Sequence, residues 1–97
     1  MRYTGTPDPI MLIGALSDLW KKGILPEACD PYFEWKLRGA PLFSLQVGYL
    51  ALIETSQHIY ELEKRKGSGR ISVEENNLLM TFCYINEEVK SHLSKLK

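Results

Sequence analysis

Four side chains of this sequence are the best suited to catalysis or metal binding: His58, His92, Cys29 and Cys83. A cysteine next to a histidine can act as a nucleophile, because the imidazole takes up the thiol proton. The sequence around these residues contains no nucleophile elbow, no H-x-E zinc motif and no His or Cys pair spaced four positions apart on one helix face. The cysteines also lack a C-x-x-C pattern, which indicates free thiols. We therefore expect no catalytic residue, no metal ligand and no cofactor, and we predict that the protein is not an enzyme.

A short basic segment, KRKGSGR from Lys64 to Arg70, is the second candidate for chemistry. Glycine-rich turns that bind phosphate usually follow a buried strand and match GxxxxGK[ST] or GxGxxG, and this segment does neither. Its glycines instead predict the end of one helix, a tight reversal and the start of the next helix after Ser72. We interpret the segment as a corner, and we retain as the alternative a contact between an anionic partner and Lys64, Lys66 and Arg70.

The composition of the chain narrows the classes of partner. The chain has 97 residues, of which 44% are hydrophobic and 25% charged, with 12 basic and 12 acidic side chains. This balance provides no long-range attraction to nucleic acid or to an anionic membrane. The longest uncharged apolar run, from Ile10 to Ser17, is far shorter than the roughly 20 residues that cross a bilayer. We expect a single helical domain over residues 1–97 that is cytoplasmic and does not bind membranes, of a size often found in proteins encoded by phages and other mobile elements.

Two short helices are predicted in the N-terminal part of the chain. Asp8 precedes a proline at a helix start, and Gly23 is suited to end that helix, which gives a helix over residues 9–22. Asp30 and the proline after it repeat the start signal, and Gly39 repeats the stop signal. The helix between them is short and rich in aromatic residues.

Two long helices are predicted after it. Pro41 can open a helix that continues to about residue 66, because no further breaker occurs before Gly67. Ser72 begins the capping-box pattern S-x-x-E, which predicts a helix over about 73–95. The fold class is therefore all-α: a small bundle of four helices built on a long antiparallel α-hairpin (about 41–66 and 73–95), with a buried N-terminal helix and a short aromatic helix.

The spacing of apolar residues predicts how the long helices pack. In the last helix, apolar residues recur on one face: Leu78, Phe82, Ile85, Val89 and Leu96. The preceding helix has a matching series: Leu42, Leu45, Tyr49, Leu52, Ser56 and Ile59. We expect these two series to form the contact of the hairpin. The first half of the preceding helix is apolar outside that series too, so a further element must cover it.

The helix over 9–22 is the expected cover, but it is apolar on nearly all sides. A chain of this size cannot easily bury all of these side chains, and the remainder would form an exposed patch of the kind that binds proteins. We therefore predict a non-enzymatic protein-binding module (a regulator, adaptor, assembly chaperone or inhibitor) that forms homo-oligomers, with a dimer favoured. The predicted interface residues are Leu12, Leu16, Trp20, Trp35 and Arg38.

Two other functions remain as alternatives. A helical module could bind nucleic acid through the basic residues near 21–38 and 64–70, although the balanced charge makes nucleic acid the less favoured partner. A helical bundle can also hold a small ligand in its core, for which we considered a pocket lined by Tyr49, Phe82 and Tyr84.

Overall fold

The structure is a computed structural model, which describes residues 9–25, 30–37 and 43–96. Within these ranges the chain forms four α-helices and no strand: α1 (Pro9–Lys21), α2 (Asp30–Leu37), α3 (Leu45–Gly67) and α4 (Val73–Leu96). The predicted all-α class with a long hairpin is confirmed. Among the helices described, none has the length and apolar character needed to cross a membrane.

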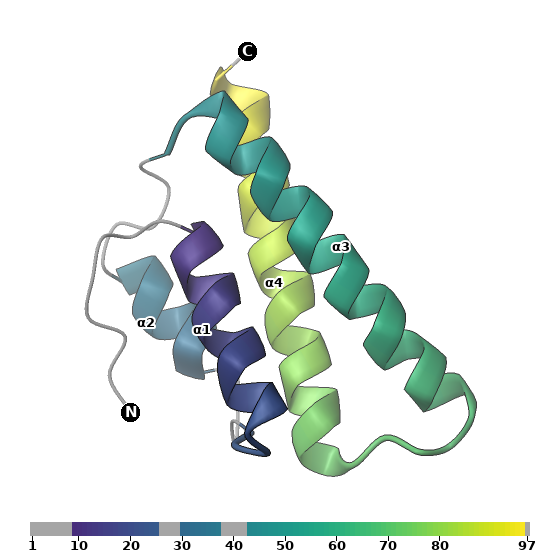
Figure 1. Cartoon of the computed structure of the whole chain (residues 1–97). Coiled ribbons are helices and arrows are strands. Elements are labelled where there is room, and N and C mark those ends of the chain that lie inside the picture. Colours follow the sequence, from purple (N-terminus) through teal and green to yellow (C-terminus); the bar gives the residue numbers. More distant parts are fainter. Residues whose placement is uncertain (1–8, 26–29, 38–42, 97) are drawn as a thin grey trace.

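The hairpin of α3 and α4 is the framework of the molecule (Figure 1). The two long helices run antiparallel and pack along each other. α1 packs against α3 and also contacts α4, whereas α2 packs on α4. In Figure 1 the two shorter helices therefore lie to one side of α4, and α3 forms the opposite edge of the molecule.

The start of α3 differs from the prediction. The helix begins at Leu45, after the predicted start at Pro41, which lies outside the described residues. Ser44 has an extended backbone, and its hydroxyl accepts a hydrogen bond from the amide of Val47 at 3.3 Å. A serine cap of this kind satisfies one of the free amides of the first turn, so it sets the start of the helix.

The corner between α3 and α4 has the structure predicted from its glycines and its capping box. Gly69 has a φ of 72°, in the left-handed region that favours glycine. At the start of α4, the hydroxyl of Ser72 accepts a hydrogen bond from the Glu75 amide at 3.0 Å, and the Glu75 carboxylate accepts one from the Ser72 amide at 3.2 Å. Glu75 also forms an ion pair with Arg65 at 3.1 Å, which ties the last turn of α3 to the first turn of α4.

The predicted apolar face of α4 is the centre of the core. Its buried apolar residues are Leu78, Leu79, Phe82, Ile85, Val89 and Leu93. The side chain of Leu96, the last member of the predicted series, lies outside the described residues. The helical period of large apolar residues therefore identified this face correctly.

The inward face of α3 is not the predicted one. The buried residues of this helix are Gly48, Ala51, Thr55 and Leu62. From the predicted series, Leu52 and Ile59 are partly buried, Leu45, Tyr49 and Ser56 are exposed, and Leu42 lies outside the described residues. The prediction was wrong because it followed the large apolar residues, whereas two helices approach closely where the side chains between them are small.

Gly48 shows how close this approach is. A Cβ atom added at Gly48 would lie 2.5 Å from Cδ2 and 3.0 Å from Cγ of Leu93, and 3.0 Å from a ring carbon of Phe43. The Leu93 side chain of α4 thus lies directly on the backbone of α3. No side chain larger than hydrogen fits at this position without a shift of its neighbours.

A buried polar contact joins α3 and α4 about two turns away from Gly48. The Asn86 side-chain amide donates a hydrogen bond to Oγ1 of Thr55 at 2.7 Å, and the Thr55 hydroxyl donates to the carbonyl of Ala51 at 2.9 Å. Both side chains are buried, Thr55 completely. Because an unpaired buried polar group is costly, this contact favours one register of the two helices over its neighbours.

The burial of α1 predicts the effect of shortening Leu16. The Leu16 side chain is 1% exposed, so Leu16→Ala should lower the free energy of unfolding by about 2–5 kcal/mol. Urea unfolding followed by circular dichroism measures the change. Met11→Ala on the same helix is the control, because Met11 is 58% exposed and should lose less than about 0.5 kcal/mol. Equal losses for the two variants would contradict the observed orientation of α1.

The contact between Asn86 and Thr55 predicts a second change in stability. Thr55→Val keeps the shape of the side chain but leaves the Asn86 amide without its acceptor, which should cost about 1–3 kcal/mol. The double variant Thr55→Val/Asn86→Leu removes both polar groups, so its cost should be smaller than the sum of the single costs. A double-mutant cycle by urea unfolding tests this, and strictly additive costs would show that the two side chains are not coupled.

Candidate functional site

Most residues of the predicted protein interface lie inside the bundle. Leu12, Leu16 and Trp35 are 5%, 1% and 5% exposed, and Trp20 is partly buried against the core. Arg38 lies outside the described residues. The sequence-based assignment is corrected for Leu12, Leu16 and Trp35: α1 turns its leucines toward the hairpin and α2 places Trp35 in the core, so these three side chains do not form a surface for a second protein.

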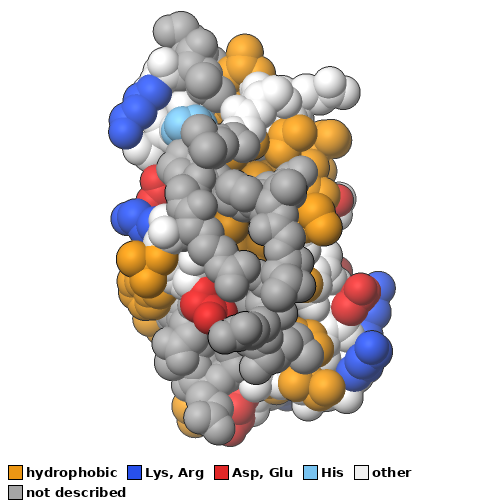
Figure 2. Space-filling model, turned by 90° about the vertical axis from the view of Figure 1, so that its left-hand side faces the viewer, with side chains coloured by type: hydrophobic (Ala, Val, Ile, Leu, Met, Phe, Trp, Pro, Cys, Tyr) orange, Lys and Arg blue, Asp and Glu red, His pale blue; other side chains and the backbone are white. Residues whose placement is uncertain are grey.

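The side of the molecule that lies left in Figure 1 offers no single large apolar area among the described residues. Figure 2 shows its hydrophobic side chains in several groups, with charged side chains between them. Scattered exposed hydrophobic side chains are ordinary on the surface of a folded protein and point to no binding site. A continuous apolar surface lies on another side of the molecule.

The outer side of α3 carries such a surface. Five large apolar side chains of this helix are between 41% and 68% exposed: Leu45, Tyr49, Leu50, Ile53 and Tyr60. At 100° per residue, most of them lie on the side of the helix opposite its buried residues. The exposure of this surface follows from the small side chains of the inward face, because they leave the large ones to point outward.

The middle of this surface is uncharged as far as Tyr60. Between Leu45 and Tyr60, seven residues lie within about 60° of the direction of Ile53 and are here called the outer seam of α3: Gln46, Tyr49, Leu50, Ile53, Ser56, Gln57 and Tyr60. None carries a charge. The next residue of α3 in this direction is Lys64, about 20° from the direction of Ile53, so the outer seam is bounded at one end by charge.

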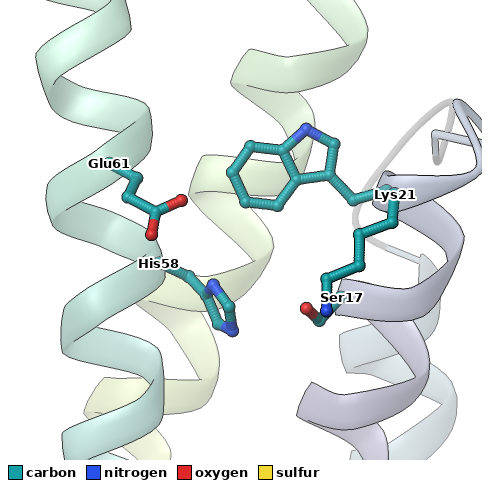
Figure 3. A pocket seen from close by; sticks show the side chains of 5 residues that line it. Ser17, Lys21, His58 and Glu61 are labelled. Atoms are coloured by element: carbon teal, nitrogen blue, oxygen red, sulfur yellow. The ribbon is translucent and has the colours of Figure 1, made fainter.

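A second candidate site is a pocket of about 360 Å³ between α1 and α3, here called the α1–α3 pocket (Figure 3). It is lined by Ser17, Trp20 and Lys21 of α1 and by His58 and Glu61 of α3. In Figure 3 the side chains of His58 and Glu61 extend from α3 into the gap, whereas the side chain of Lys21 runs along α1 toward Ser17. The spacing of three and four residues places the α1 members on one face of their helix.

His58 is held in place by two aromatic rings at the edge of the α1–α3 pocket. Its ring stacks on Phe82 of α4 with the centroids 5.0 Å apart, and its centroid is 6.1 Å from that of Trp20, with the rings edge to face. The Nδ1 atom of His58 is buried and forms no hydrogen bond. A buried nitrogen in this state costs stability unless another group satisfies it.

The two charged residues of the α1–α3 pocket do not pair with each other. Among the described residues, no ion pair joins Lys21 to Glu61, and both side chains are exposed. One wall of the pocket thus offers an ammonium group and the other a carboxylate. The sequence contained no signal for this arrangement, because the two helices approach only through the tertiary fold.

The aromatic helix α2 is fixed to α4 by a polar contact rather than presented to solvent. The Tyr32 hydroxyl donates a hydrogen bond to the Glu88 carboxylate at 3.2 Å, and Lys36 forms an ion pair with the same oxygen at 3.2 Å. Burial raises the pKa of the Tyr32 hydroxyl, and the neighbouring Glu88 charge raises it further. Phe33 remains 52% exposed beside Tyr84, but a single exposed ring is a poor platform for stacking bases.

The candidate anion contact lies at the corner of the hairpin. Lys64, Lys66 and Arg70 are all exposed there. They share this end of the bundle with the last turn of α1, as Figure 1 shows, and so with Lys21 and its neighbours. Acidic residues lie among them, however: Glu61, Glu63, Glu74 and Glu75. The end of the bundle is therefore of mixed charge and not a basic patch.

The remaining reactive side chains form no site in the described part of the chain. Burial raises the pKa of the Cys83 thiol, and the charges of Glu63 and Glu87 raise it further, so Cys83 is a weak nucleophile at neutral pH. No group of three or more His, Cys, Asp or Glu side chains that could hold a metal ion occurs among the residues described. Cys29 lies outside them, and the absence of enzymatic activity stays a prediction.

The pocket considered from the sequence does not form. Phe82 is fully buried in the core, whereas Tyr49 and Tyr84 are each about half exposed, at 45% and 40%. Tyr49 lies on the outer side of α3, and Tyr84 packs against Tyr32 of α2. The three rings therefore do not share a cavity, and the α1–α3 pocket is a different space, lined by other described residues.

No protein-family model, no curated protein sequence and no solved structure matches this chain. The two candidate sites, the outer seam of α3 and the α1–α3 pocket, therefore rest on their own geometry and chemistry.

Proposed function

We propose that this chain is a non-enzymatic protein-binding module that self-associates through the outer seam of α3. The observation that carries the proposal is the exposure of large apolar side chains along one helix: Ile53 is 55% exposed and Tyr60 is 68% exposed. Removing apolar surface from water stabilises a complex by about 25 cal/mol per Å² of surface covered. Covering these side chains with a second protein would therefore favour association.

The composition of the outer seam also suits a protein interface. The centres of such interfaces are depleted in charged residues and enriched in tyrosine and other aromatic residues. The outer seam has two tyrosines, Tyr49 and Tyr60, and no charge. A dimer formed in this way can serve as a regulator, adaptor, assembly chaperone or inhibitor, and the cytoplasmic compartment and an origin in a phage or mobile element are part of the same hypothesis.

Nucleic-acid binding is less well supported. Polyanion binding needs cations collected in one patch or stripe. The corner cations are interleaved with acids, Arg65 is paired with Glu75, and Lys36 is paired with Glu88. The charges that the sequence offered for this function are thus partly neutralised within the subunit.

The proposal predicts the effect of a charge at the middle of the outer seam. Ile53→Glu should raise the dissociation constant of the dimer at least about 100-fold, because a carboxylate would lose its water without gaining a partner. Light scattering and sedimentation velocity at micromolar concentrations measure the change, and circular dichroism verifies that the variant is folded.

Val73→Glu is the matched control for this experiment. Val73 is 75% exposed but lies at the start of α4, where a carboxylate is favoured by the helix dipole. The control should leave the dimer intact. A native protein that is strictly monomeric, or a dimer that tolerates Ile53→Glu, would overturn the proposal.

A second candidate function is small-ligand binding in the α1–α3 pocket, favoured by the unsatisfied Nδ1 of His58 and by the unpaired Lys21 and Glu61. A carboxylate of the ligand suits Lys21, an ammonium suits Glu61, and an apolar body suits the indole of Trp20. The class of ligand that combines these groups is a small zwitterion of amino-acid size.

Tryptophan fluorescence tests this candidate, because Trp20 lines the pocket while Trp35 is buried elsewhere in the core. L-phenylalanine should change the emission in a saturable manner. Lys21→Met or Glu61→Gln should weaken the binding by about 1.5–5-fold, as expected for exposed charge pairs, whereas Lys22→Met and Glu63→Gln should not. If phenylalanine produces no saturable change up to millimolar concentrations, this class of ligand is ruled out.

A further inference from the structure

We infer that two copies of the chain pair through their α3 helices in antiparallel orientation, with the two-fold axis passing at Ile53. This inference rests on the proposed self-association and adds the partner, the direction and the register. It follows from the arrangement of the outer seam, from the charges beyond its end and from the place of α3 in the bundle.

Ile53 lies at the midpoint of the outer seam, which runs from Gln46, next to the start of α3 at Leu45, to Tyr60, the last seam residue before Lys64. A two-fold axis at Ile53 therefore pairs Gln46 with Tyr60, Tyr49 with Gln57, and Leu50 with Ser56. In a dimer with a two-fold axis at Ile53, each of these residues meets its counterpart on the other copy. Every such pair is uncharged, and two of the three pairs join an apolar side chain to an amide.

The charges of α3 favour the antiparallel direction over the parallel one. In a parallel pair in register, Glu61, Glu63 and Lys64 of one copy would each lie beside the same residue of the other, and like charges at an interface are unfavourable. In the antiparallel pair Glu61 lies opposite Leu45, the first residue of the partner's α3, and Glu63 and Lys64 lie beyond that start, so no charged residue meets its own copy. Glu54, the remaining acid in this part of α3, is half-buried at the border between the outer seam and the buried face.

The place of α3 in the bundle leaves room for a second copy. α3 packs on α4 and α1 with its inward face, and α2 packs on α4. In Figure 1, α3 lies at the edge of the molecule, away from α2. A partner helix can therefore lie along the outer seam without meeting another described helix of the same subunit.

The size of the outer seam predicts the strength of the dimer. From Gln46 to Tyr60 it is roughly 21 Å long at 1.5 Å per residue. Its four apolar side chains, each of about 150–250 Å², expose roughly 300–550 Å² at the observed fractions. A standard interface buries roughly 800 Å² per partner, so we expect a dissociation constant in the micromolar range.

Disulfide cross-linking tests the direction and the register. The background is the full chain with Cys29→Ser and Cys83→Ala, and oxidised glutathione is the oxidant. Ile53→Cys should give a cross-linked dimer at least about tenfold faster than Gln46→Cys, because two copies of position 46 would be roughly 21 Å apart, far beyond the roughly 7 Å limit between Cα atoms of a disulfide. A mixture of Gln46→Cys and Tyr60→Cys chains should cross-link as the mixed dimer.

The outcomes separate this inference from the proposed function. A dimer by light scattering in which Gln46→Cys chains cross-link with each other as fast as Ile53→Cys chains would show parallel pairing and overturn the inference alone. A dimer in which neither Ile53→Cys nor the mixed pair cross-links would also overturn the inference alone. A monomer at all concentrations up to about 1 mM, well above the micromolar range of a dimer of this size, would overturn both.

Discussion

The close approach of α3 and α4 is the constraint on which the rest of this structure depends. Two long helices can lie this close only where the side chains between them are small, and α3 supplies Gly48, Ala51 and Thr55 at these places. α4 supplies the large side chains that fill the remaining space, such as Phe82 and Leu93. The hydrogen bond from Asn86 to Thr55 then favours one register of the pair, because any other register would leave buried polar atoms without partners.

The two shorter helices and the candidate pocket follow from this arrangement. α4 carries apolar residues over a wide arc, so it needs cover beyond α3, and α1 and α2 provide that cover. Their own apolar residues, such as Leu16 and Trp35, are buried in these contacts. The packing between α1 and α3 is less complete. His58 stacks on Phe82, and its buried Nδ1 forms no hydrogen bond. The α1–α3 pocket lies beside it.

The outer seam of α3 is the other consequence of the same constraint. A helix that gives its small residues to the core must turn its large residues elsewhere, and on α3 these are tyrosines, a leucine and Ile53. Such a surface is poorly suited to water and well suited to a second helix. The small inward side chains that let α3 pack closely on α4 thus leave an apolar, uncharged surface on the opposite side of α3. We propose that a second subunit binds there.

The sequence by itself determined those features that depend on neighbouring residues in the chain. The all-α class, the corner and the capping box of Ser72 and Glu75 could be predicted because prolines, glycines and caps act over a few residues. The buried face of α4 could be predicted because its large side chains repeat with the helical period. Only the tertiary structure decided which side of α3 is buried, and with it both candidate sites, because the space left between two helices depends on the side chains of both. The apolar pattern of α3, read alone, pointed to the wrong side, and nothing in the sequence placed His58 opposite Lys21.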